Sequence, residues 1–587
     1  MSFYPREKGE YKEVSGVLKA LEKAARMPNL HMVDLNEVFR WENWRAYRNI
    51  NKDIYPFENE LESQIVNADL TSRFMASAFE IDAMISMLNT LLDFAYGFQE
   101  QFKLSQERLV SKLSKGFGSL PDELVSKIFQ FAVWEEREYG GKQAIWLSQV
   151  SRRYRVLSLE TRSLWTTLHS RDSDGRLEMF ISRAGPNEEF HVFLHSESFF
   201  NPYLFARKCH STMSRWKTLT LTQEDQDWYS ERLSYGGVEN ILESLLGFLG
   251  KNGMQFEMLE DLDICGDRSD YYGRLESGNL RWATSKLRTL RCSYFLPSPS
   301  DNFSSVTSFA CTQSISSGYE KSPLKWIFAF LSAMPKLSFF DLEVYDATAT
   351  YSGSNDLLVL PTCEKPSITS FHLRLRNFDL SKFEAESSCI TKLVNVLRMP
   401  SLKDLSISIG VCARSYGNYY PFVNSGRSQE KSTKWSRALY NASHALLPDH
   451  FTDSAQLASL SYEVWLDGHG HTDSPPALNG RVFHIPLHRI LDVSNMTVTS
   501  FVPVLFTQGF GDENLQPTGF GESSRLRELK FIGCENMTEE DIRWTVRSLR
   551  LIGVLKNIVR VIVKDCDKIV YDDIVGVVGE ERLHFLD

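Results

Sequence analysis

Histidines and carboxylates gather near residue 470, and these residue types suit metal chemistry better than any others in the chain. The cluster consists of Asp467, His469, His471, Asp473, His484 and His488. Four converging imidazole and carboxylate groups can hold zinc, so a metal-dependent hydrolase is one reading of this segment. A His-x-His pair between turn glycines is more typical of a solvated loop, and we therefore expect no metal site here.

Other motifs associated with catalysis are absent from the sequence. It contains no GxxxxGK[ST] phosphate-binding loop, no GxSxG nucleophile elbow and no HExxH metal-binding helix. The nine cysteines form no CxxC pair, so we interpret them as small core residues of a protein in a reducing compartment. We therefore expect a protein that is not an enzyme and that needs no cofactor.

Charge and hydropathy argue against two classes of partner. The formal net charge is −10 over 587 residues, whereas a general nucleic-acid binder shows a basic face. No run of about 18 apolar residues occurs, so no membrane-spanning segment is expected. The first residues, "MSFYPREKGEYKEVSG", lack the apolar core of a secretory signal. We expect a cytoplasmic or nuclear protein with neither membrane nor nucleic acid as a partner.

Residues 57–115 are predicted to be helical. Apolar residues recur there every three or four positions with no interrupting proline: Ile81, Ile85, Leu88, Leu92, Ala95, Phe102, Leu109 and Leu113. An extended helix that dimerises as a coiled coil fits this spacing, and so does a helical hairpin. We favour the hairpin because charges at the positions flanking a coiled-coil seam are scarce. Gly116 and Gly118 are predicted to end the helix. No role is assigned to the N-terminal arm, residues 1–56.

Residues 116–170 are predicted to form three short helices. Pro121 lies in the first turn of the first helix, where its missing N–H costs nothing. The apolar residues of this helix are assigned to one face and its border: Leu124, Ile128, Ala132, Phe129 and Val125. A second helix is predicted over "QAIWLSQVSRRYRVLSLE" and a third over "TRSLWTTL". Three such helices make a marginal core, which a partner is expected to complete.

Four separated elements of this segment resemble the F-box family. The family pattern starts with Leu-Pro-x-Glu-Leu, continues with Ile-Phe and then Val-Ser-Arg-x-Trp or Tyr, and ends with Leu-Trp. The matching residues are Leu120-Pro121-Asp122-Glu123-Leu124, Ile128-Phe129, Val150-Ser151-Arg152-Arg153-Tyr154 and Leu164-Trp165. The sequence departs from the pattern in a longer, charged loop between the first two helices and in Tyr154, where tryptophan is commoner. Residues 80–200 resemble the fungal kind of F-box protein.

This resemblance implies a docking function. An F-box binds the Skp-type adaptor of a cullin–RING ubiquitin ligase, and through it the cullin and RING subunits. Such recognition places the apolar residues of helices in the grooves of a partner. The implied contact residues are Leu120, Pro121, Leu124, Ile128, Phe129, Val150, Tyr154, Leu164 and Trp165. Some of these must instead fill the segment's own core, and the sequence does not separate the two groups.

Residues 171–587 repeat the pattern Φ-x-x-Φ-x-Φ, in which Φ is apolar. Examples are "WKTLTL", "LEDLDI", "LSFFDL", "LKDLSI" and "LRELKF", with "FHVFLH" as a first rung. Helical stretches such as "CITKLVNVLRMP" lie between the rungs and end at Met-Pro. We therefore predict an α/β fold: N-terminal helices and the three-helix segment, then an irregular leucine-rich-repeat solenoid with a curved parallel sheet.

Two parts of the solenoid are singled out. An insertion near 411–455 could be a binding loop, since long loops on a rigid scaffold often bind, but we favour a plain surface elaboration. A capping helix is expected within "KIVYDDIVGVVGEERLHFLD". The strand positions expected to face outward, and so to contact a substrate, are Lys217, Thr218, Glu260, Asp261, Arg288, Lys403, Arg527 and Glu528. Their mixed charges favour a protein ligand over a nucleic acid.

The combined hypothesis is a non-catalytic substrate receptor of a ubiquitin ligase. The F-box would bind the Skp-type adaptor, and the repeats would bind a protein substrate whose identity the sequence does not reveal. One alternative is a binding scaffold that dimerises through residues 57–115. Another is the metal-dependent hydrolase that would use His469 and His471.

Overall fold

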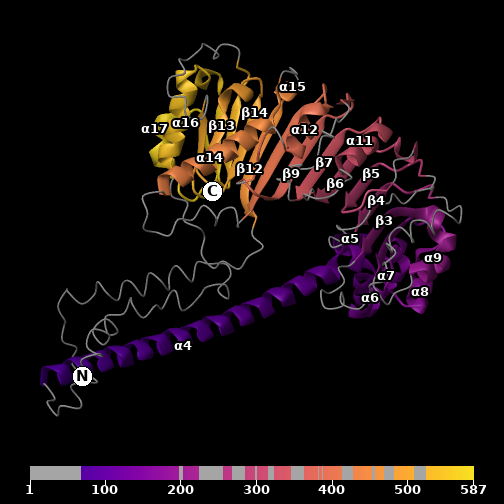
Figure 1. Cartoon of the computed structure of the whole chain (residues 1–587). Coiled ribbons are helices and arrows are strands. Elements are labelled where there is room, and N and C mark those ends of the chain that lie inside the picture. Colours follow the sequence, from indigo (N-terminus) through magenta and orange to yellow (C-terminus); the bar gives the residue numbers. More distant parts are fainter. Residues whose placement is uncertain are drawn as a thin grey trace, which may run out of the picture. The chain divides into compact units, whose positions relative to one another are not determined.

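Figure 1 shows the computed structural model of the chain. The chain forms two units, residues 1–121 and residues 122–587. The predicted N-terminal arm, residues 1–56, lies outside the described residues. The structure describes residues 68–196, 202–223, 256–266, 284–297, 301–314, 323–345, 362–380, 382–385, 388–412, 428–452, 457–467, 481–507 and 524–586.

The first unit contains a long helix, α4 (Ala68–Ser119), of 52 residues. The helix continues through the described part of the segment that was predicted as a hairpin, because no turn occurs between residues 68 and 119. The hairpin prediction is therefore wrong. An extended helix is the alternative that remains for this segment.

The two glycines near the end of α4 do not end it. Gly116 and Gly118 are both helical, which corrects the sequence prediction, and a helix tolerates each glycine at a cost of about 1 kcal/mol. The helix ends at Ser119 because Leu120 precedes a proline, and that position disfavours helical backbone. Pro121 has no N–H with which to continue the hydrogen-bond ladder.

The second unit begins with short helical elements. They are α5 (Asp122–Glu135), η3 (Arg137–Tyr139), α6 (Gly140–Val150), α7 (Arg152–Glu160) and η4 (Arg162–Trp165), where η denotes a 3₁₀-helix. The predicted second helix is two helices, because Ser151 has extended backbone between α6 and α7. Its hydroxyl accepts a hydrogen bond from the Tyr154 N–H at 3.1 Å and caps α7. The predicted third helix is the single turn η4, after which the chain enters the sheet.

One parallel sheet runs through the rest of the unit (Figure 1). Its 14 strands follow the chain order, with each hydrogen-bonded to the next. They are β1 (Thr167–His169), β2 (Phe190–Ser196), β3 (Trp216–Gln223), β4 (Asp261–Cys265), β5 (Thr289–Ser293), β6 (Ser308–Ser314), β7 (Phe339–Tyr345), β9 (Ser370–Phe378), β11 (Asp404–Cys412), β12 (Ser459–Asp467), β14 (Asn495–Ser500), β16 (Glu528–Ile532), β17 (Arg560–Lys564) and β18 (Leu583–Leu586). This arrangement confirms the predicted α/β fold with a solenoid-like parallel sheet.

Helices and small strand pairs fill the connections between these strands. The helices are α8 (Asp174–Ala184), α9 (Pro202–Lys208), α11 (Pro323–Ala333), α12 (Cys389–Val396), α14 (Ser428–Ala445), α15 (Asp449–Thr452), α16 (Glu539–Leu551) and α17 (Tyr571–Val578). The small parallel pairs are β8 (Cys363–Glu364) with β10 (Leu397–Arg398), and β13 (Phe483–Pro486) with β15 (Val504–Thr507). No helix among the described residues is both long and apolar enough to cross a membrane.

The described part of the predicted insertion packs on the sheet. Residues 428–452 form α14 and α15, and the Tyr462 hydroxyl of β12 donates to the Ser443 carbonyl of α14 at 3.1 Å. Trp435 of α14 is fully buried. This part is a covering helix of the solenoid, and not the plain surface elaboration that we expected.

Alternate side chains of most strands, such as β6, β7 and β9, are buried on the face that the helices cover. Phe309, Phe340 and Phe371 lie in register on β6, β7 and β9, with ring centroids 5.7 and 5.3 Å apart. Phe330 of α11 stacks on Phe309 at 5.8 Å. The residues between them are half-buried, as Phe339 is, and form the other surface, which we call the open face.

Substitution of two neighbouring phenylalanines on β7 tests the assignment of a buried face and an open face. Phe340→Ala removes a ring from the buried stack, so we expect a loss of about 3–5 kcal/mol in the free energy of unfolding. The matched control Phe339→Ala removes the same ring from the open face, where it contacts His372 edge-on at 4.9 Å, and should cost about 1 kcal/mol. Urea unfolding measures both, and equal losses would contradict the assignment of the two faces.

Candidate functional site

A pocket of about 1080 Å³ lies beside the first strands of the sheet. Phe131 and Trp134, at the C-terminal end of α5, contribute aromatic side chains to it. Strands β2 to β5 contribute residues of the open face, and η3 contributes Arg137 and Glu138. The pocket therefore combines large exposed aromatic rings with charges of both signs, a composition that suits a peptide or protein ligand.

Strand register decides which outward residues meet in the pocket. His191, Thr218 and Asp261 occupy matched positions on β2, β3 and β4. The next row contains Asp263 and Arg291, whose carboxylate oxygen and guanidinium nitrogen lie 3.7 Å apart. Burial raises the pKa of the Asp263 carboxyl, and Arg291 opposes that shift.

Three of the predicted open-face residues line this pocket: Lys217, Thr218 and Asp261. The Lys217 ammonium donates to the Glu189 carboxylate at 2.7 Å, and this hydrogen bond raises the pKa of Lys217. The bond fixes the amine at the rim of the pocket. Both partners are partly exposed, so the pair adds little to stability.

The other predicted open-face residues lie outside the pocket. Glu260, Arg288, Lys403 and Arg527 each come directly before a strand, and each backbone carbonyl accepts two N–H groups from the next rung. They therefore mark the edge of the sheet where the strands begin. Glu528 lies on β16, many strands from the pocket, where its carboxylate pairs with Lys530 at 3.0 Å.

Sequence reasoning missed Asp263 and Arg291, although the pattern held the signal. Both occupy the last x of Φ-x-x-Φ-x-Φ, in "LEDLDI" and "LRTLRC", and strand alternation turns that position outward as well. Phe131 and Trp134 were missed for another reason. They lie in the F-box-like helix, and only the fold brings that helix to the first strands.

Helix α5 has two apolar faces, and not the single face that was predicted. Val125, Phe129 and Val133 are buried. Leu124 and Ile128, which were predicted to form one apolar face with Val125 and Phe129 at its border, are 47% and 38% exposed. Together with Phe131 they form an exposed stripe at positions i, i+4 and i+7 of the helix.

The structure divides the predicted adaptor contacts into two groups. Phe129, Leu164 and Trp165 are buried, and the Trp165 indole N–H donates to the Ser158 carbonyl at 2.7 Å. Tyr154 is half-buried and packs edge-on against Phe129, with centroids 4.8 Å apart. These residues fill the core of the segment.

Three of the remaining predicted contacts are open to a partner. Leu124, Ile128 and Val150 are exposed in the second unit. Leu120 and Pro121 belong to the first unit, where Leu120 is half-buried and Pro121 is exposed. An ion pair between Asp122 and Arg153, at 2.5 Å, joins the first turns of α5 and α7 beside this surface.

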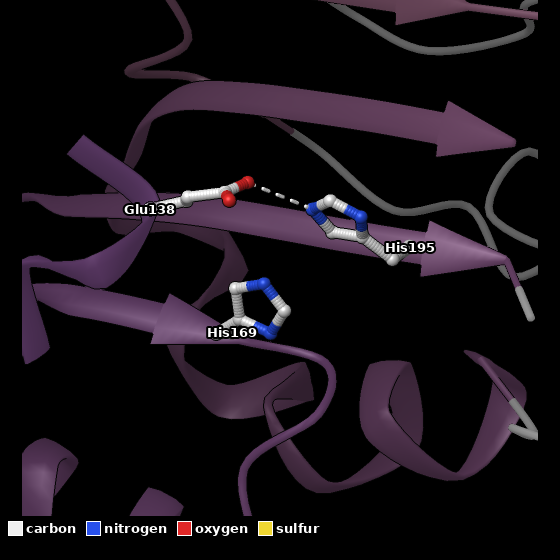
Figure 2. A group of neighbouring side chains, drawn as sticks. All are labelled: Glu138, His169 and His195. Atoms are coloured by element: carbon white, nitrogen blue, oxygen red, sulfur yellow. Dashed lines mark ion pairs between the residues drawn. The ribbon is translucent and has the colours of Figure 1, made fainter. Parts of the chain in front are cut away.

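A compact group is formed by Glu138, His169 and His195 (Figure 2). Glu138 also lines the pocket. His195 Nε2 lies 3.2 Å from a Glu138 carboxylate oxygen, and the two imidazole rings stack with centroids 4.7 Å apart. Burial, together with His195, lowers the pKa of His169 to about 4. Among the described residues, this is the group whose ligand atoms converge as a metal site requires.

A hydrogen bond at the far side of His169 opposes metal binding by this group. The Arg171 backbone N–H donates to His169 Nδ1 at 2.9 Å, so Nδ1 carries a lone pair. A neutral imidazole with an unprotonated Nδ1 bears its proton on Nε2, the atom that faces Glu138 and His195 in Figure 2. Metal-bound histidines show the opposite arrangement, because their second nitrogen donates. We therefore interpret the group as a buried polar contact.

The metal cluster considered in the sequence is not assembled by the described residues. His469, His471 and Asp473 lie outside them. The Asp467 carboxylate accepts the Asn377 N–H at 2.8 Å, and burial lowers the pKa of His484 to about 4. The described members of that cluster belong to no converging ligand group.

Comparison with known proteins gives little further information. No family model matches the sequence, and no curated protein matches it. One solved structure that resembles the chain is a chain from the Rad7 and Elc1 complex in yeast, with 12% sequence identity and a TM-score of 0.30. The match covers 82% of this chain and 97% of the other. A TM-score of 0.30 is too low to support an inference about this protein. The F-box resemblance stays a prediction.

The buried histidine predicts a pH dependence of stability. The pKa of His169 is about 4 in the folded protein against an ordinary value of 6.5, and the nearby charges are Glu138, His195, Arg171 and Lys142. Between these two pH values the unfolded chain binds a proton that the folded protein does not, so acidification lowers the free energy of unfolding.

His169→Asn isolates this contribution, because asparagine does not titrate and its side-chain oxygen can still accept the Arg171 N–H. After allowance for solvent screening, the wild type should lose on the order of 1–2 kcal/mol more than the variant between pH 6.5 and pH 4. Urea unfolding at a series of pH values measures the difference. Parallel pH profiles would show that His169 is not held in its neutral form.

Proposed function

We propose that this protein is a non-catalytic substrate receptor of a cullin–RING ubiquitin ligase. One surface of its helical segment would dock on a Skp-type adaptor, and the open face of the sheet would bind a protein substrate. The cullin and RING subunits would then bring the transfer chemistry close to that substrate. No step of this role requires a catalytic residue, a cofactor or a metal ion in this chain.

The exposed stripe on α5 is the observation that carries the proposal. Leu124, Ile128 and Phe131 are 47%, 38% and 68% exposed, although the opposite face of the same helix is fully packed. Burial of one such side chain contributes about 1.5–3 kcal/mol, so the stripe is a strong site for a partner's groove. Two of its residues match the F-box pattern, and Val150, which also matches, is exposed as well.

We assign substrate binding to the open face of the sheet. The side chains of this face are chemically varied, and the core does not require them. Ion pairs cross it, such as Asp341 with Arg374 at 2.6 Å and Glu343 with Arg376 at 2.7 Å. Charges of both signs side by side do not form the basic surface that nucleic-acid phosphates require, whereas they suit a protein surface. The pocket beside Trp134 belongs to this face.

A cytoplasmic or nuclear location accords with this role. None of the nine cysteines, all of which are described, forms a disulfide, and eight of them are buried, as expected where thiols stay reduced. Burial raises the pKa of Cys209 and of Cys311 to about 12, so these two thiols are unreactive core residues.

Binding of a purified fungal Skp-type adaptor tests the docking surface. We expect a stable complex with the wild-type chain and at least a 100-fold weaker one, by roughly 2.7 kcal/mol, with the double variant Leu124→Lys and Ile128→Lys. Lysine at these positions would bring charge into an apolar groove. Isothermal titration calorimetry gives the two dissociation constants.

Leu551→Lys is the matched control, because Leu551 is also an exposed helical leucine, at the end of α16. This variant should bind as the wild type does. All three proteins should unfold at similar temperatures, since each substituted side chain is exposed. A complex that survives the double substitution, or a wild type that binds no adaptor, would refute the proposed docking surface.

A further inference from the structure

Helix α4 carries an apolar seam that the proposed ligase role does not use. Positions alternately four and three residues apart contain Phe74, Ala78, Ile81, Ile85, Leu88, Leu92, Ala95, Gln99, Phe102, Gln106, Leu109 and Leu113. The repeat of seven residues keeps this stripe on one side of a helix that coils around a partner helix. The seam extends over most of the 52 residues of α4.

The seam is exposed wherever its side chains are described. Ile85, Leu92, Ala95, Phe102 and Leu109 are all exposed, with Leu92 at 51% and Phe102 at 72%. A helix of this length spans about 78 Å and cannot bury such a stripe by itself. Most helical stability in proteins comes from packing of the apolar face, so this helix needs a partner along its length.

Charged residues are scarce beside the seam because several of the flanking positions hold apolar residues. Tyr96 and Val110 flank it on one side and Phe98 on the other, and all three are exposed. They widen the apolar stripe at the positions where charges would otherwise select a partner. The scarcity of charges that favoured a hairpin from the sequence is therefore compatible with a broad helix–helix interface.

Two glutamines in the seam identify the partner. Gln99 and Gln106 occupy equivalent positions of successive repeats, and both are exposed. In a parallel pair of identical helices in register, each glutamine lies opposite its own copy, so the two amides can bond to each other. A partner with an uninterrupted apolar seam would leave both amides buried without a hydrogen bond, which is costly.

We infer that α4 forms a parallel, in-register coiled coil with a second copy of this chain. This self-association is independent of the proposed ligase role and would make the protein a homodimer. Each protomer would then carry its own copy of residues 122–587, so that the dimer presents two copies of the pocket.

Mass in solution tests the inference on the full chain. Sedimentation or light scattering should give twice the chain mass of 67.4 kDa for the wild type. Leu92→Asp combined with Phe102→Asp puts carboxylates into the seam and should halve the mass. Leu104→Asp is the matched control, because Leu104 is 53% exposed on the side of α4 away from the seam, and this variant should stay dimeric.

Circular dichroism verifies that the second unit of each variant remains folded. A monomeric wild type, or a dimer that withstands both seam substitutions, would overturn the inference.

Cysteine cross-linking tests the orientation. In a parallel, in-register dimer, Gln99→Cys and Gln106→Cys each place two thiols opposite one another, so both variants should form disulfide-linked dimers under mild oxidation. In an antiparallel dimer, at most one of the two positions can lie on the symmetry axis. Efficient cross-linking of one variant alone would therefore refute the parallel arrangement. The unsubstituted chain, with its nine native cysteines, serves as the control for background cross-linking.

Discussion

The in-register burial of alternate side chains along parallel strands is the constraint on which the second unit depends. A single strand with its helix cannot remove its apolar face from water, so each rung is stable only against its neighbours. The stacked rings of Phe309, Phe340 and Phe371 are an example. Each ring covers the ring of the preceding strand and so removes it from water. The helices on that face, such as α11 with Phe330, complete the enclosure.

Because most of the packing is on one side, the open face has more freedom to vary. The open face can carry polar, charged or aromatic residues because these residues do not take part in the core. Ion pairs on this face connect neighbouring strands. The same division extends to the helical segment. Trp165 of η4 contacts Phe180 of α8, with centroids 5.8 Å apart, and the Arg183 guanidinium lies 4.2 Å from the Trp165 ring. The helical segment and the first rungs therefore share one core, and a partner bound to α5 would be held rigidly relative to the pocket.

Patterns of short period predicted the elements well, whereas choices between alternative partners were predicted poorly. The strand motif located nearly every rung because alternation of apolar and polar residues follows from strand geometry itself. The division of α5 into two apolar faces could not be read in this way. Leu124 and Phe129 are equally apolar, and only the packing of the segment, in which Phe129 meets Tyr154, decides which of them is buried. The end of α4 was misplaced because the proline at residue 121 outweighs two glycines that a helix can tolerate.

The sequence by itself determined the succession of strands and helices, the parallel sheet and the apolar seam of α4, because each is written in the spacing of neighbouring residues. Only the tertiary structure decided which apolar residues stay exposed, and which charges meet in the pocket. The members of the buried polar group, Glu138, His169 and His195, come from three separate elements. Trp134 and Asp263, which both line the pocket, come from two. Such groups meet through strand register and helix packing, which depend on residues far apart in the chain, and no local pattern records those distances.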